Sequence, residues 1–191
     1  VVVTPYDPGF RMENKYYIIW AEDADALAEE ANVVELGHSD KDVYDDTKFS
    51  SVIDVQAPFY WMVIGESALN AKNFDEAMGA EEGMEYEETG FLFAQNNEDF
   101  PGFAIYQEGT GKYQFEVDMY YNAEDEEYPV YTISPAFDNL WTPGNSNGWS
   151  HDNSNMLFTS DYVTYTGYAY LNGSFKFSNA ADWNHTNYGT T

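Results

Sequence analysis

Three side chains near the end of the chain combine flat aromatic faces with a long amine. Trp149 ends the stretch NGW directly after a turn, Lys176 lies in the strand-like stretch FKF, and Trp183 follows seven residues later in a polar loop. An indole can cover the apolar CH face of a pyranose, while an amine donates hydrogen bonds to the hydroxyls at its rim. Asn187 offers a further polar group beside them. These residue types predict a site for a sugar ring.

The strength of such a site can be estimated from the area it covers. Covering roughly 60 Å² of each indole at about 25 cal/mol per Å² gives ~1.5 kcal/mol apiece. Hydrogen bonds add about 1 kcal/mol each, and association entropy removes much of the total. The expected Kd is about 0.1 to 1 mM. A site this weak is most useful when it is repeated along one protein.

The alternative for the two loop tryptophans is that they pack in a core or plug their loops. Three other tryptophans favour that role more clearly. Trp20 and Trp61 lie in apolar strand-like runs, and Trp141 lies at a strand end before Thr-Pro-Gly. We expect these three to be core residues.

Metal and cofactor chemistry has little support in the sequence. The acidic run DKDVYDD, residues 40–46, lacks the glycine and the final glutamate of an EF-hand loop, so a solvated acidic face is expected. His38, His151 and His185 are scattered without the spacing of a zinc site. We therefore expect neither a metal nor a cofactor.

A glycosidase needs two carboxylates that face each other across a cleft. Asp152, Asp161 and Asp182 lie near the aromatic residues in sequence, but spacing does not establish that they face one another. No GxSxG or comparable nucleophile motif is present. The expectation is a protein that is not an enzyme.

The composition narrows the class of partner. The chain has 191 residues, a net charge of −27, 17 Tyr, 13 Phe, 5 Trp and no Cys. So many aromatic residues argue against disorder, and so much acid argues against nucleic acid or a basic membrane-docking patch. Without cysteine, disulfides and thiolate sites are excluded. No apolar run is long enough to cross a bilayer.

The local patterns predict an all-β chain of antiparallel strands. β-branched and aromatic residues predict strands, and a continuous apolar run predicts a strand that is buried on both faces. Turn residues between alternating runs predict hairpins. The expected elements are strands at 15–20, 48–56, 59–65 (buried on both faces) and 128–135, a short helix or acidic loop at 21–31, a long loop at 70–88, a hairpin at 102–121 around Gly109-Thr110-Gly111, a strand and Gly/Asn turn at 139–149, and a hairpin of 163–171 with 173–178 around Asn172-Gly173.

A change in composition near residues 134–138 predicts a domain boundary. Acidic residues crowd the part before Pro135, and Asn, Ser, Thr, Gly and Tyr dominate after it. We expect an extended linker at 1–10, a first β-sandwich at 11–134 without an evident aromatic cradle, and at 135–191 the N-terminal part of a second sandwich. So short a second part would leave an open sheet edge.

Residues 138–191 resemble a carbohydrate-binding module of the SusE/SusF family. The motifs that carry the resemblance are LWTPGNSNGW, YTGYAYLNGSFKF and DWNHTNYG. By this resemblance Trp149, Lys176 and Trp183 match the family's starch-binding trio. Residues 11–134 are similar to another such module through KYYIIW, FYWMVIG and GKYQFEVDM, but they lack the trio. That part is interpreted as a spacer or as a binder of something else.

The resemblance implies a starch-binding lipoprotein of the bacterial outer-membrane surface. It implies tandem, immunoglobulin-like β-sandwiches that bind an α-glucan, attachment to the membrane through a lipid anchor, and partnership with a glycan importer. The alternative is a structural or adhesion module whose aromatic side chains pack against a protein partner. Binding to amylopectin separates the two hypotheses.

Overall fold

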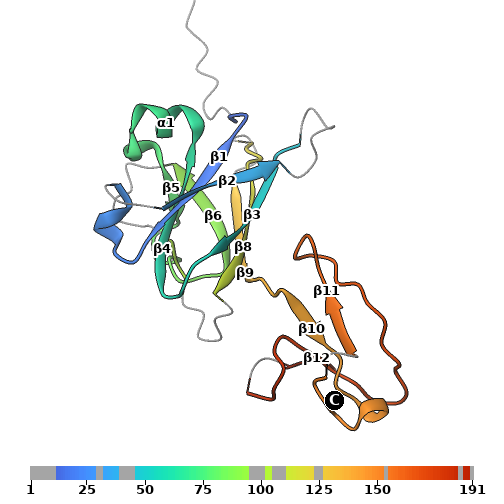
Figure 1. Ribbon diagram of the computed structural model, residues 1–191. Helices are drawn as coiled ribbons and strands as arrows, with labels where there is room; N and C mark the ends of the chain where they lie inside the picture. Colours follow the sequence, from blue (N-terminus) through green and yellow to red (C-terminus); the bar gives the residue numbers. More distant parts are fainter. Residues whose placement is uncertain are drawn as a thin grey trace, which may run out of the picture. The chain divides into compact units, whose positions relative to one another are not determined.

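A computed structural model describes residues 12–28, 32–38, 46–94, 102–104, 111–122, 127–152, 155–184 and 187–189. The chain divides into two compact units, residues 1–105 with 113–134 and residues 106–112 with 135–191. Each unit is built from antiparallel strands and short helices (Figure 1). The expected all-β class is therefore confirmed.

The described residues of the first unit form nine strands. Its elements are β1 (Tyr16–Ala21), the 3-10 helix η1 (Ala24–Ala28), β2 (Asn32–His38), β3 (Lys48–Asp54), β4 (Phe59–Gly65), α1 (Glu66–Ala71), the 3-10 helix η2 (Phe74–Glu76), β5 (Met78–Ala80), β6 (Thr89–Ala94), β7 (Gly102–Ala104), β8 (Lys112–Asp118) and β9 (Val130–Pro135). The strand order is β1-β2-β3-β8-β9-β6-β5-β4-β7, and β1 also pairs with β4, which closes the sheet on itself. Strands at 15–20, 48–56, 59–65 and 128–135 and the short helix are thus confirmed.

The main core of this unit is aromatic. Trp61 of β4 is fully buried and makes edge contacts with Phe115 of β8 and Tyr131 of β9, at ring-centroid distances of 5.4 and 4.6 Å. Phe59 contacts Tyr113 in the same way at 5.3 Å. Edge-to-face packing of this kind is favourable beyond the area it buries.

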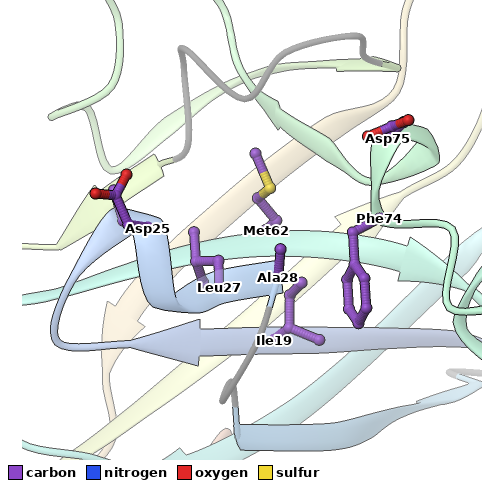
Figure 2. A pocket seen from close by; sticks show the side chains of 8 residues that line it. Ile19, Asp25, Leu27, Ala28, Met62, Phe74 and Asp75 are labelled. Carbon is purple, nitrogen blue, oxygen red and sulfur yellow. The ribbon is translucent and has the colours of Figure 1, made fainter.

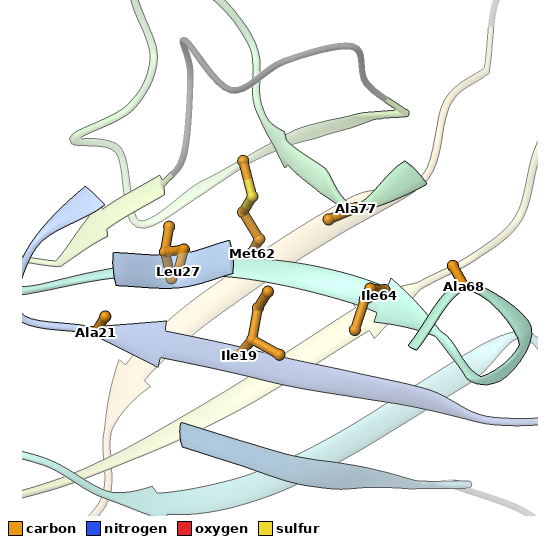
Figure 3. Close-up of a cluster of buried hydrophobic side chains, with 7 residues drawn as sticks. All are labelled: Ile19, Ala21, Leu27, Met62, Ile64, Ala68 and Ala77. Carbon is orange, nitrogen blue, oxygen red and sulfur yellow. The ribbon is translucent and has the colours of Figure 1, made fainter. Parts of the chain in front are cut away.

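β1 and β4 are apolar on both faces because a second cluster covers their other side. Ile19 of β1 and Met62 and Ile64 of β4 pack there against Leu27 of η1 and Ala68 of α1 (Figure 3). The continuous apolar run at 59–65 therefore reflects burial on both faces, as predicted. Trp20 and Trp61 are core residues, also as predicted.

Two expectations for the first unit were wrong. The runs at 102–104 and 112–118 do not form a hairpin, because β7 pairs with β4 while β8 lies between β3 and β9. The expected loop at 70–88 contains the end of α1, η2 and the short strand β5. In both places pairing with distant strands outweighs the local turn signals.

The second unit repeats part of this topology. Its elements are β10 (Asn139–Trp141), the 3-10 helix η3 (Asn145–Asn147), β11 (Met156–Phe158), β12 (Phe177–Ser178) and β13 (Asn187–Tyr188). The strand order is β11-β10-β12-β13. The corresponding series in the first unit is β2-β1-β4-β5, with the same antiparallel pairings. The four strands described in the second unit thus match four in the first.

The expected hairpin of 163–171 with 173–178 is also wrong. Residues 163–171 form no strand, and Thr166 makes only an isolated bridge with Phe158. Tyr168 and Tyr170 are 97% and 74% exposed. An alternating sequence becomes a strand only where a neighbour accepts its backbone hydrogen bonds, and the described part of this unit provides none along most of the segment.

Candidate functional site

The loop after β10 presents Trp149 in an uncommon backbone conformation. Gly148 and Trp149 both have φ of 65°, in the left-handed region. For a residue with a side chain this conformation costs about 1–2 kcal/mol. The Trp149 N–H donates to the Gly144 carbonyl oxygen at 2.8 Å, which closes the loop. Strain of this kind persists only where the surrounding contacts hold it.

Asn147 supplies most of those contacts. Its Oδ1 accepts from the Gly144 N–H at 2.8 Å, and its Nδ2 donates to the carbonyl oxygens of Thr142 at 3.3 Å and Ser150 at 3.0 Å. Gly144 must lack a side chain, because a Cβ there would lie 2.7 Å from the Ser174 carbonyl oxygen. The Gly/Asn-rich turn predicted from sequence is therefore a tightly bonded loop.

The same loop is attached to the segment that contains Lys176. The Lys176 N–H donates to the Pro143 carbonyl oxygen at 2.9 Å, and Asn145 N–H donates to the Ser174 carbonyl oxygen at 2.9 Å. Lys176 is the last Lys or Arg in the chain, and it makes no ion pair with any residue that the structure describes. Its side chain is half-buried.

Trp149 and Trp183 come together although they lie in different loops. Their ring centroids are 6.2 Å apart and the ring planes are inclined by 45°. The two residues are 37% and 49% exposed. Ser178 Oγ donates to the carbonyl oxygen of Ala180 at 2.8 Å, which shapes the loop that leads to Trp183. Neither tryptophan is a core residue; they form a pair with open surface.

His151 belongs to this cluster, and sequence reasoning missed it. Its ring centroid lies 4.4 Å from that of Trp183, with the planes at 77°. Burial lowers the pKa of His151 below its ordinary value of 6.5, and the negative charge of Asp182 partly opposes this shift. Near neutral pH the imidazole is therefore uncharged and packs edge-on against the indole. Its position two residues after Trp149 was the only available signal.

Asn187 lies in β13, opposite Ser178 of β12. Its Oδ1 atom is buried, so that oxygen does not face solvent. Lys176 lies two residues before Ser178. A Cβ at Gly189, two residues after Asn187, would lie 3.3 Å from the Cγ of Lys176. The participation of Asn187 in a ligand site stays a prediction.

The acidic and histidine groups have local roles where the structure describes them. Asp161 accepts N–H bonds from Val163 and Thr164, which lowers the pKa of its carboxyl group. Asp152 accepts from Asn155 Nδ2 at 3.3 Å, and Asp182 accepts from the Asn184 N–H at 2.8 Å. Each of the three aspartates considered as glycosidase residues therefore accepts hydrogen bonds from residues close to it in sequence.

Metal-binding groups do not gather in the described part of the chain. There, no cluster of three or more His, Asp or Glu side chains is placed to hold a metal ion. Residues 40–45 of the acidic run and His185 lie outside the described residues. Asp46, which ends the run, contacts His38 Nδ1 at 2.8 Å.

Trp141, which was expected to be a core residue, is only half-buried.

Helices of the described part are all too short or too polar to cross a membrane.

Among curated proteins, none matches the chain. One similar solved structure is SusF from Bacteroides thetaiotaomicron, at 16% identity and a TM-score of 0.51, over 98% of this chain and 40% of that one. The chain thus spans less than half of that protein, and the likeness shows a shared fold.

A family model matches residues 11–133, nearly two thirds of the chain and almost all of the first unit. Its description is the first starch-specific CBM, or carbohydrate-binding module, of SusF. The match falls on the part whose resemblance is weaker in sequence, and the tryptophan pair lies beyond it. The chain belongs to the family of the first starch-specific carbohydrate-binding module of SusF.

Proposed function

We propose that the protein binds a starch-like α-glucan without catalysis, through a cradle formed by Trp149, Lys176 and Trp183, with Asn187 at its edge. The observation that carries the proposal is the pair of solvent-accessible indoles, 6.2 Å apart and inclined by 45°. Family membership supports a carbohydrate as the ligand. Lys176, the only Lys or Arg in the sequence after residue 112, supplies hydrogen-bond donors to sugar hydroxyls.

The inclination of the two rings favours a curved glycan. A flat β-1,4-linked chain stacks best on coplanar platforms, whereas a helical α-1,4-linked chain turns its successive rings away from one plane. Two indoles at 45° can each cover one sugar of a curved chain. The expected affinity is weak, with a Kd of about 0.1 to 1 mM, because each platform contributes only ~1.5 kcal/mol.

The proposal also covers the arrangement of modules along the chain and the location of the protein in the cell. The second unit is the N-terminal part of a second module, a view supported by the strand order that it shares with the first unit. The resemblance to SusE/SusF proteins supports a location at the bacterial outer-membrane surface. It also supports attachment through a lipid anchor and a partnership with a glycan importer. The family match supports the starch system as the context.

An adhesion or structural role is the second candidate. Exposed apolar side chains in the second unit favour this role, because such groups often mark protein contacts. They are Phe158, Val163, Tyr168 and Tyr170, which are 53%, 67%, 97% and 74% exposed. Under that role the aromatic groups pack against a protein, and polysaccharide has no effect on the chain.

Native electrophoresis through gels that contain polysaccharide tests the proposal. Amylopectin in the gel is expected to retard the protein, and hydroxyethylcellulose, which has β-1,4 linkages, is expected to leave its mobility unchanged. Unchanged mobility in both gels would favour the adhesion role. Equal retardation in both would contradict the preference for a curved chain.

A further inference from the structure

The first unit has a pocket at the place that corresponds to the tryptophan pair. In the second unit, Trp149 follows β10, and Trp183 lies between β12, which pairs with β10, and β13. In the first unit, η1 follows β1, and η2 lies between β4, which pairs with β1, and β5. η1 and η2 together line the pocket (Figure 2). The same topological position thus holds the tryptophan pair in the second unit and a pocket in the first.

The floor of this pocket is apolar and well packed. Ile19, Leu27 and Met62 belong to the buried cluster that covers β1 and β4, and Phe74 of η2 packs against that cluster. The cavity has a volume of about 200 Å³. Pockets for drug-sized ligands run from about 300 to 1,000 Å³, so this one suits a single ring rather than an oligosaccharide.

Among the described residues that line the pocket, the polar side chains are two carboxylates. Asp25 of η1 and Asp75 of η2 stand on either side of the apolar floor, with Leu27, Met62 and Phe74 between them (Figure 2). Both aspartates are exposed, and neither is in an ion pair with a residue that the structure describes. The remaining described lining residues are Ile, Ala, Leu, Met and Phe, which provide no side-chain donor.

A site whose described side chains offer two acceptors and no donor selects its ligand by charge. A neutral sugar can donate hydroxyl hydrogen bonds to the two carboxylates, but no charge attracts it to them. An anionic sugar would be repelled by the carboxylates and by the net charge of −27. A protonated amine only donates, and it is attracted to both aspartates. An apolar floor beneath them suits the CH face of a ring.

We propose that the pocket lined by Asp25 and Asp75 binds a single pyranose ring that bears a protonated amine, an amino sugar. The ring covers Met62 and Phe74, and the ammonium group lies toward the two carboxylates. This site goes beyond the proposed α-glucan cradle and does not depend on it, because it uses only residues of the first unit. The chain would then bind two classes of sugar at topologically equivalent places.

Methionine methyl resonances provide a direct test in the full chain. Met62 is one of six methionines, and its signal can be assigned with the volume-conserving variant Met62→Leu. Glucosamine at low ionic strength and mildly acidic pH is expected to shift the Met62 methyl signal, with a Kd of about 1 mM. Glucose and N-acetylglucosamine, which lack the charge, are expected to bind at least about threefold more weakly.

The isosteric variants Asp25→Asn and Asp75→Asn are each expected to weaken glucosamine binding about threefold, as for an exposed ion pair. An unchanged Met62 spectrum in these variants without ligand shows that the fold is kept. The proposal is overturned if glucosamine up to about 10 mM leaves Met62 unmoved, if glucose shifts it equally, or if both variants bind as the parent does. Trp149→Ala is expected to leave this binding intact, so failure of the cradle would be seen separately.

Discussion

Replacing Trp149 or Trp183 with alanine is expected to weaken binding of maltoheptaose about tenfold, since each platform contributes ~1.5 kcal/mol. The two indoles lie 6.2 Å apart and would share one ligand in the proposed cradle, so their effects are expected to be coupled rather than strictly additive. The double variant is expected to run through an amylopectin gel as if no polysaccharide were present. Calorimetric titration of the single variants measures the individual losses.

Tyr168→Ala is the matched control for this experiment. Tyr168 is 97% exposed, lies in the same unit and is also aromatic, so its removal tests whether any exposed ring supports binding. We expect its affinity for maltoheptaose to equal that of the parent. All variants should keep the same far-UV circular dichroism. Equal loss in Tyr168→Ala, or no loss in the double variant, would refute the cradle.

The second large effect concerns stability. Trp61→Ala is expected to lower the free energy of unfolding of the first unit by about 3–5 kcal/mol, because it removes a fully buried indole from between Phe115 and Tyr131. A loss of this size is a large part of the ~5–15 kcal/mol that holds a domain folded. Urea unfolding followed by circular dichroism measures it, with the two units treated as separate transitions.

Trp61→Phe separates volume from polarity at the same position. The indole Nε1 of Trp61 is buried and has no hydrogen-bond partner among the described residues. Replacement by phenylalanine therefore breaks no hydrogen bond to a described residue and leaves a smaller cavity than alanine does, so it should cost clearly less. If both variants unfold at the parent's urea midpoint, the proposed role of Trp61 in the core is incorrect.

Much of the fold was predictable where one residue pattern determines burial. The apolar run at 59–65 indicated a strand covered on both faces, and β4 is such a strand. Pairing could not be predicted in the same way. The two alternating runs around Gly111 suggested a hairpin, yet β7 pairs with β4. The pairing of β7 depends on the strand order of the whole sheet and not on the nearest turn.

The site was predictable only in part for the same reason. Tryptophans among Gly, Asn and Asp indicated exposed rings, and Trp149 and Trp183 are exposed. The contact of His151 with Trp183 arises between two loops, so no short pattern contains it. Likewise, η1 follows β1 and η2 follows β4 and α1, so the pairing of β1 with β4 brings residues of both 3-10 helices to the pocket lined by Asp25 and Asp75.

Indole N–H resonances of the wild-type protein test the central claim most directly. The chain has five tryptophans, of which Trp20 and Trp61 are buried in the first unit. Titration with maltoheptaose is predicted to shift the signals of Trp149 and Trp183 together, with one Kd, and to leave those of Trp20 and Trp61 in place. Shifts confined to other tryptophans, or no shift at saturating sugar, would contradict the account.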